Sequence, residues 1–239
     1  MGEKEEGVGF MKKIYILHGW AYTTERWQPL VGILKNNGIE AVMLKIPGLT
    51  APLDEVWDLD DYVEWLGREL VHEKEQVVLV GHSNGGRISL AFAAKYPDRV
   101  EKLILIDSGG IYHNEFFIRV KRLVFGNLAR LGRRITNSQS LRGFLYKLTR
   151  ESDYERANPN LRKTMRNLIS TDISYLLSSV DIPTTIIWGE HDGITPLADG
   201  RLMHKGLHNS TLHIIKGAKH SPMFTHAEEV GETILEGLG

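Results

Sequence analysis

A serine lies between two glycines in residues 81–85, which read Gly-His-Ser-Asn-Gly. The hydroxyl of such a serine becomes a nucleophile for acyl transfer when a base accepts its proton, and the base needs an acid to fix its tautomer. The apolar run 76–80 precedes this segment, and the helix-compatible stretch 87–95 follows it. This placement predicts a sharp strand-to-helix turn, where glycines are needed because no room is left for Cβ atoms. We therefore predict that Ser83 is a nucleophile.

An aspartate and a histidine later in the chain occupy places that suit the acid and the base. Asp192 lies in residues 188–193, Trp-Gly-Glu-His-Asp-Gly, directly after a predicted strand, and His220 lies in the loop after the last predicted strand. A serine on this kind of turn is followed along the chain by its acid and then by its histidine. Ser83, Asp192 and His220 come in that order, so we predict that they form a catalytic triad.

Two other carboxylates compete with Asp192 for the role of the acid. Asp107 also ends a predicted strand, and Glu190 lies in the same loop as Asp192. For Asp107 we favour a structural role, in which its side chain hydrogen bonds the turn before Gly109 and Gly110. The histidines at positions 191, 208, 213 and 226 are expected to have structural or surface roles, so they weaken the assignment of His220 as the base little.

Acyl transfer also needs two N–H donors aimed at the oxyanion that develops on the substrate. The backbone N–H of Asn84, directly after the nucleophile, is the first of these donors. The loop after the first predicted strand, residues 18–21, supplies the second in this topology, and we assign it to the backbone N–H of Trp20. The indole of Trp20 and the imidazole of His18 are also candidates for substrate contact, although we favour a role for His18 in supporting the loop.

The elements that position these residues must bring the ends of several strands together. Short apolar runs alternate with helical patterns along most of the chain, which is typical of a doubly wound α/β fold with a mostly parallel sheet. In such a sheet the active site lies at the carboxyl ends of the strands, and each motif above follows such an end. The expected strands are 13–17, 40–44, 76–80, 102–106, 184–188 and 211–215, and the expected helices are 25–36, 58–73, 84–95, 197–207 and 225–237.

The alternation stops between residues 111 and 180, where helical periodicity dominates. We therefore predict a helical cap at 111–180, inserted into an α/β core made of 1–110 and 181–239. Phe117 and Phe144 lie on apolar faces of this cap and are expected to contact the substrate. The three apolar patterns are Phe117, Val120, Val124, Leu128 and Leu131; Leu141, Phe144, Leu145 and Leu148; and Leu161, Met165 and Leu168.

Charge is divided unevenly between the predicted cap and the predicted core. Residues 111–180 hold 13 Lys or Arg against 5 Asp or Glu, although the net charge of the whole chain is −1. A basic amphipathic helix suits either solvent or an anionic membrane surface, and we favour the solvated face. Pairing with the acidic core of a second subunit is a further alternative. The acidic core and the lack of a reader motif argue against nucleic acid as a partner.

The composition excludes several classes of site. The chain has 239 residues, enough for a substantial core, and it has no cysteine, which excludes disulfides, thiolate metal sites and cysteine catalysis. The acidic first residues do not resemble a signal peptide, and the apolar runs are too short to span a membrane, so we expect a cytoplasmic protein. We expect no metal and no cofactor, because the acidic residues show no clustered ligand spacing and no glycine-rich phosphate loop is found.

Together these segments resemble the α/β-hydrolase superfamily. The matching segments are 17–20, 46–48, 80–86, 103–107, 187–192 and 217–222. Within the superfamily the chain is most similar to small bacterial carboxylesterases with a helical cap. It departs from many relatives at Ala21 and Lys45, where they have glycine and aspartate, and both positions lie near the expected mouth of the pocket.

The expected activity is hydrolysis of small-molecule carboxylic esters or lactones with apolar acyl groups, through an acyl-enzyme on Ser83. Two alternatives belong to other classes. The run Gly-x-Ser-x-Gly-Gly-Arg at 81–87 also resembles a lyase of the menaquinone pathway, in which Arg87 and the basic cap would meet an anionic substrate. A local salt bridge is the other explanation for Arg87. The second alternative is a non-catalytic small-molecule receptor that retains the triad.

Overall fold

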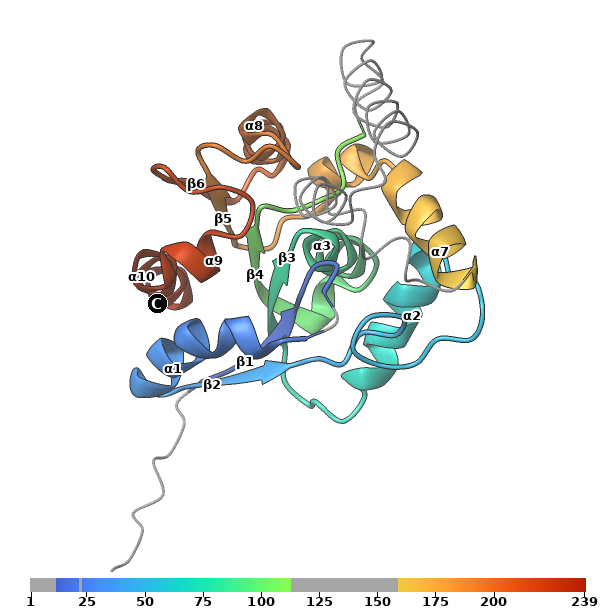
Figure 1. The fold of residues 1–239 in the computed structure, drawn as a ribbon. Coiled ribbons are helices and arrows are strands. Elements are labelled where there is room, and N and C mark those ends of the chain that lie inside the picture. Colours follow the sequence, from blue (N-terminus) through green and yellow to red (C-terminus); the bar gives the residue numbers. More distant parts are fainter. Residues whose placement is uncertain (1–11, 22, 113–158) are drawn as a thin grey trace, which may run out of the picture.

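Six parallel strands form one sheet in the computed structural model, which describes residues 12–21, 23–112 and 159–239 (Figure 1). Their order across the sheet is β2-β1-β3-β4-β5-β6, so the chain first moves to one edge and then adds every later strand on the other side. This is the doubly wound parallel sheet that the alternation predicts. The strands are β1 (Lys12–Leu17), β2 (Ile39–Met43), β3 (Val77–His82), β4 (Val100–Ile106), β5 (Thr184–Gly189) and β6 (Ser210–Ile215).

The central strands are apolar because both of their faces are covered by helices. β3 and β5 are buried along their whole length, whereas the edge strands β2 and β6 are only partly buried. The pairing register sets His82 beside Ile106, and Ile106 beside Ile187. The residues that follow β3, β4 and β5 therefore emerge side by side at one end of the sheet.

Helices cover both faces of the sheet (Figure 1). On one face α1 (Gln28–Asn36) and α10 (Ala227–Leu238) pack against each other and against the strands. The other face is covered by α2 (Leu59–Glu69), α3 (Asn84–Lys95) and α8 (Leu197–Gly206). Each helix turns an apolar stripe toward the sheet, as the helical spacing in the sequence predicts.

The ends of the predicted helices and strands lie within four residues of those in the structure. The expected helix at 25–36 begins with a 3-10 turn, η1 (Glu25–Trp27), before α1. α2 ends at Glu69 rather than at residue 73, because the chain enters turns from Leu70 onward. A short helix that the sequence did not predict, α9 (Pro222–Thr225), follows the loop of His220, with Pro222 as its first residue. Proline suits that position because its missing N–H would have no partner there.

The last part of the predicted cap packs on the core as α7 (Pro159–Ser170) and a 3-10 segment, η3 (Ser174–Ser179). The predicted apolar pattern Leu161, Met165 and Leu168 is buried. Polar contacts hold α7 to the loop before α2, since Thr164 Oγ1 accepts a hydrogen bond from the N–H of Trp57 at 2.9 Å. The side chain of Leu161 packs closely against the backbone at Gly48, and this contact joins α7 to the loop after β2.

Phe117, Phe144 and most of the basic residues of the predicted cap lie outside the described residues. The division into a core and a cap at 111–180 therefore stays a prediction. No helix within residues 12–21, 23–112 and 159–239 is both long enough and apolar enough to cross a membrane.

Candidate active site

Ser83 occupies the sharp turn between β3 and α3, with a backbone φ of 53° and ψ of −117°. Positive φ is strained for a residue with a side chain, so the surrounding backbone must hold it there. The flanking glycines make this possible. A Cβ at Gly85 would lie 2.0 Å from the carbonyl oxygen of Leu17, and a Cβ at Gly81 would lie 2.5 Å from the Cα of Gly86. The sequence pattern thus folds into the predicted nucleophile turn.

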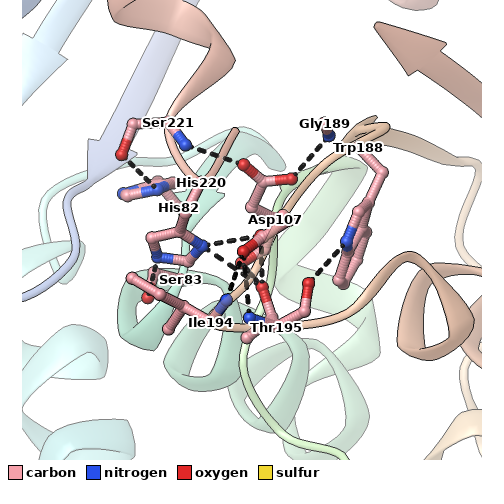
Figure 2. Close-up of polar contacts among 10 residues, drawn as sticks. His82, Ser83, Asp107, Trp188, Gly189, Ile194, Thr195, His220 and Ser221 are labelled. Atoms are coloured by element: carbon pink, nitrogen blue, oxygen red, sulfur yellow. Dashed lines mark hydrogen bonds and ion pairs between the residues drawn. The ribbon is translucent and has the colours of Figure 1, made fainter. Parts of the chain in front are cut away.

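The three residues predicted as a triad are joined by hydrogen bonds, and Figure 2 shows the contact between His220 and Ser83. Nε2 of His220 lies 3.0 Å from Oγ of Ser83, and Nδ1 of His220 lies 2.7 Å from Oδ2 of Asp192. The side chains of His220 and Asp192 are 5% and 0% exposed. With the Nδ1 proton directed at the carboxylate, Nε2 is left to accept the serine proton. This geometry can generate an activated serine, with the imidazole and the carboxylate shielded from water.

Asp192 is held by more donors than the sequence indicated. Its Oδ1 accepts hydrogen bonds from the N–H groups of Ile194 and Thr195, at 2.7 and 3.1 Å. Its Oδ2 accepts the hydroxyl of Thr195 at 2.7 Å as well as the proton of His220. We did not single out Thr195 from the sequence. The available signal was its position three residues after an aspartate in a loop, where such turn hydrogen bonds are common.

Asp107 has a different partner set from the one we predicted. Its carboxylate does not bind the turn before Gly109 and Gly110; the N–H of Gly109 donates instead to the carbonyl of Ser83, at 2.8 Å. The two oxygens of Asp107 accept the N–H groups of Gly189 and Ser221, both at 2.8 Å (Figure 2). The predicted local role was wrong because the side chain of Asp107 reaches across the carboxyl ends of the strands, away from its own turn. Asp107 connects the loop that carries Asp192 with the loop that carries His220.

The electrostatic state of Asp107 follows from its surroundings. The residue is fully buried, and its backbone φ is +43°. Burial, followed by the nearby carboxylate of Asp192, raises the pKa of Asp107 well above the usual range of an aspartate. The two backbone N–H donors oppose this rise. Neighbouring buried carboxylates favour a state in which one of them is protonated.

A second histidine lies directly behind the triad. The ring of His82 lies 4.9 Å from the ring of His220, and its Nε2 lies 3.3 Å from Oγ of Ser221. Among the described residues, His82, Asp107 and His220 form a group whose ring nitrogens and carboxylate oxygen lie within 4.8 Å of one another. Each of these side chains already takes part in a hydrogen bond within the site, so we interpret the group as part of the triad's support and not as a metal centre.

The predicted oxyanion donors border the nucleophile. Asn84 is the first residue of α3, so its N–H has no acceptor within the helix. The loop that carries Trp20 approaches Ser83 closely, since a Cβ at Gly19 would lie 3.0 Å from the Cβ of Ser83. Both backbone segments thus lie beside Ser83, where the oxyanion would form.

His18 and Trp20, in the loop after β1, differ in their contacts. His18 is buried, with Nδ1 2.7 Å from the carbonyl oxygen of Gly19 and Nε2 3.0 Å from Oγ1 of Thr50. Burial lowers the pKa of His18, and neither of its ring nitrogens is left for a substrate. These contacts agree with support of the loop. The half-buried indole of Trp20 packs against Leu161 and Met165 of α7 and forms an apolar wall with them.

Comparison with known proteins connects most of the chain to one family. A family model described as serine aminopeptidase, S33, matches residues 11–226. The pimeloyl-(acyl-carrier protein) methyl ester esterase of Neisseria meningitidis is 22% identical over 241 residues, which cover 91% of this chain and 90% of that protein. A 2-hydroxy-6-oxononadienedioate/2-hydroxy-6-oxononatrienedioate hydrolase of Cupriavidus pinatubonensis is 25% identical over 250 residues, which cover 92% of this chain and 82% of that protein.

Solved structures have the same fold. A bromoperoxidase from Bacillus anthracis has a TM-score of 0.71 at 25% identity and covers 95% of this chain and 91% of its own. A thermophilic esterase from Thermogutta terrifontis has a TM-score of 0.69 at 21% identity and covers 96% of this chain and 90% of its own. Because one fold supports many reactions, this likeness bears on the architecture more than on the substrate.

Proposed function

We propose that this chain, which belongs to the serine aminopeptidase S33 family of α/β-hydrolases, hydrolyses carboxylic esters through an acyl-enzyme on Ser83. The observation that carries this proposal is the continuous chain of hydrogen bonds from Ser83 through His220 to Asp192, at 3.0 and 2.7 Å. It lies at the carboxyl ends of the central strands, where ligands of open α/β sheets bind.

The proposed reaction begins when Oγ of Ser83 attacks the ester carbonyl while Nε2 of His220 takes the serine proton. Asp192 holds the Nδ1 proton and stabilises the imidazolium that forms. The backbone N–H groups of Asn84 and Trp20 would bind the oxyanion of the tetrahedral intermediate. His220 then gives its proton to the departing alcohol. Water, activated by the same histidine, releases the acid from Ser83.

The part-buried indole of Trp20, in the loop beside Ser83, supports an apolar acyl group as the substrate's acid part. Leu161 and Met165 are buried behind this indole, and an acyl group that covers its exposed part would remove apolar area from water. The Neisseria relative is named as a methyl ester esterase, which supports an ester as the substrate. The Cupriavidus relative is named as a hydrolase of 2-hydroxy-6-oxo dienedioates, so substrates of that type belong in the same test.

The contacts of Arg87 bear on the lyase alternative. Arg87 is buried, its Nη1 donates to the carbonyl of Thr171 at 3.4 Å, and its Nε has no partner among the described residues. Burial lowers its pKa to about 10, while the charge of Asp172 opposes the change. These contacts tie α3 to the segment after α7, and they support an anchoring role. We therefore place ester hydrolysis first; pyruvate release from the menaquinone intermediate would reverse that order.

A fluorophosphonate probe, followed by peptide mass spectrometry, tests for the activated serine directly. We expect a single adduct on Ser83 and none in Ser83→Ala. The same two proteins are then assayed with short and long p-nitrophenyl esters, an aminoacyl p-nitroanilide and a 2-hydroxy-6-oxo dienedioate. Ester turnover that depends on Ser83 supports the proposal. A folded protein without labelling or turnover, or turnover unchanged in Ser83→Ala, overturns it, and tight ligand binding without turnover would favour the receptor.

A further inference from the structure

The hydroxyl of Thr195 lies where the acid, the base and the second buried aspartate meet. Its Oγ1 is 2.7 Å from Oδ2 of Asp192, 3.3 Å from Nδ1 of His220 and 3.1 Å from the carbonyl oxygen of Asp107. Figure 2 shows Thr195 beside His220 and Asp107. The backbone of Thr195 is fixed as well, because its carbonyl accepts the indole N–H of the buried Trp188 at 2.9 Å. The position of this hydroxyl is therefore set by the fold.

A hydroxyl has one proton, so Thr195 can donate to only one of its two acceptors. A carboxylate attracts that proton more strongly than a neutral carbonyl does, and charge-assisted O–H···O bonds are short. The 2.7 Å contact to Asp192 is shorter than the 3.1 Å contact to the carbonyl of Asp107. Thr195 thus donates to Asp192, on the same oxygen that faces His220.

The carboxylates of Asp192 and Asp107 differ in how many hydrogen bonds they accept. Among the described residues, Asp192 accepts hydrogen bonds from Ile194, from His220 and from both the N–H and the hydroxyl of Thr195. Within the same part of the chain, Asp107 accepts two from N–H groups, both of the backbone. Hydrogen bonds to the charged form favour it, so the better-supplied carboxylate keeps the charge. The raised pKa of Asp107 agrees with this division.

We propose that Thr195 is a positioning residue that keeps the negative charge on Asp192, beside His220, rather than on Asp107. The proposal rests on the proposed function, in which Asp192 orients His220. The titratable groups that surround the Asp192 carboxylate are His220 from the loop after β6, Asp107 from the end of β4 and, behind them, His82 from the end of β3. Without the hydroxyl, the proton shared by the two carboxylates resides more often on Asp192, and His220 loses its charged partner.

A matched pair of variants separates the hydroxyl from the shape of the side chain. Thr195→Val removes the hydroxyl at nearly constant shape, and Thr195→Ser keeps the hydroxyl and removes the methyl group. We expect kcat/KM for a p-nitrophenyl ester to fall about tenfold or more in Thr195→Val, mostly through kcat, because a hydrogen bond to a charged group is lost. Thr195→Ser should recover most of that loss. Thr195→Ala provides a second hydroxyl-free variant if Thr195→Val does not fold, as checked by thermal unfolding.

The pH profile distinguishes charge placement from a merely structural effect. If Thr195 keeps Asp192 ionised, the deficit of Thr195→Val relative to wild type grows as the pH falls and shrinks as it rises. A deficit that is equal at every pH, or a hydroxyl-free variant with more than half of wild-type kcat/KM, overturns the proposal.

Wild-type protein without Ser83-dependent turnover would instead contradict the proposed function. The Thr195 proposal is then judged by the proton NMR signal of the His220–Asp192 hydrogen bond, which should move in Thr195→Val but not in Thr195→Ser.

Discussion

The ends of β4 and β5 each carry a buried aspartate, and the two carboxylates have different partners. Asp107 directly follows β4 and accepts two backbone N–H groups, from Gly189 and Ser221. Asp192 lies three residues beyond β5 and accepts hydrogen bonds from its own loop and from His220. The first carboxylate joins two loops, and the second faces the base. Residue type and strand position are nearly the same, so the donors around each carboxylate decide its role.

The different partners of Asp107 and Asp192 also explain how both carboxyl groups can be buried in one site. Two adjacent carboxylates repel each other when both are ionised, and that repulsion grows where water is excluded. A protonated Asp107 removes the repulsion and can still accept N–H groups. The charge then remains on Asp192, where the imidazolium of His220 needs it. Four changes test this division of roles, from the largest expected effect to the smallest.

Asp192→Asn should have the largest effect of the four changes, a loss of activity. The N–H groups of Ile194 and Thr195 would hold the amide oxygen, so the NH2 group would face Nδ1 of His220 and the histidine would lose the tautomer that accepts the proton of Ser83. We expect kcat for a p-nitrophenyl ester to fall by roughly 10⁴-fold, with little change in folding. Steady-state kinetics and circular dichroism measure the two quantities. Retention of a tenth of the wild-type rate would mean that Asp107 can act as the acid in place of Asp192.

Asp107→Ala should act mainly on stability. The N–H groups of Gly189 and Ser221 would be buried without acceptors, and each such group costs about 1–3 kcal/mol. We expect the free energy of unfolding in urea to fall by about 3 kcal/mol or more, with activity lost as the two loops separate. A decrease below about 1 kcal/mol would show that water replaces the carboxylate, and that Asp107 is not the connection between the loops.

The pH dependence of stability should reveal the protonated carboxyl. Because the pKa of Asp107 is raised in the folded protein, the folded state binds a proton that the unfolded state releases above about pH 4. This contribution to stability is fully present at low pH and is lost as the pH rises toward the folded pKa. Through this group the free energy of unfolding decreases by at most about 1.4 kcal/mol for each pH unit. Urea unfolding between pH 5 and 8, roughly the window in which this proton is bound only by the folded state, should show the slope in wild type and a weaker slope in Asp107→Asn.

Glu190→Gln should have the smallest effect, although Glu190 lies two residues from Asp192. Its side chain is 42% exposed, and its Oε2 accepts the N–H of Gly217 at 2.9 Å, an interaction that the amide oxygen of glutamine can replace. We expect kcat/KM within about twofold of wild type and stability within about 0.5 kcal/mol. A loss comparable to that of Asp192→Asn would place Glu190 in the triad.

Local patterns in the chain determined the elements and much of the site. Apolar runs with helical stretches between them predicted six strands and their neighbouring helices, because burial on both faces leaves a clear signal. The glycines around Ser83 predicted the turn, since close backbone approach excludes Cβ atoms. The order of Ser83, Asp192 and His220 indicated residues that the structure joins by hydrogen bonds. Boundaries such as the end of α2 were less exact, because turns carry weaker patterns.

The sequence by itself therefore determined the strand-to-helix turn, the parallel sheet and the pairing of Asp192 with His220 as acid and base. The tertiary structure alone decided that Asp107 joins two loops and that the hydroxyl of Thr195 lies against Asp192. The physical reason is that these roles depend on donors from segments far away in the chain. Gly189 and Ser221 lie 82 and 114 residues from Asp107, and no local pattern records which N–H groups a carboxylate will meet once the strand ends come together.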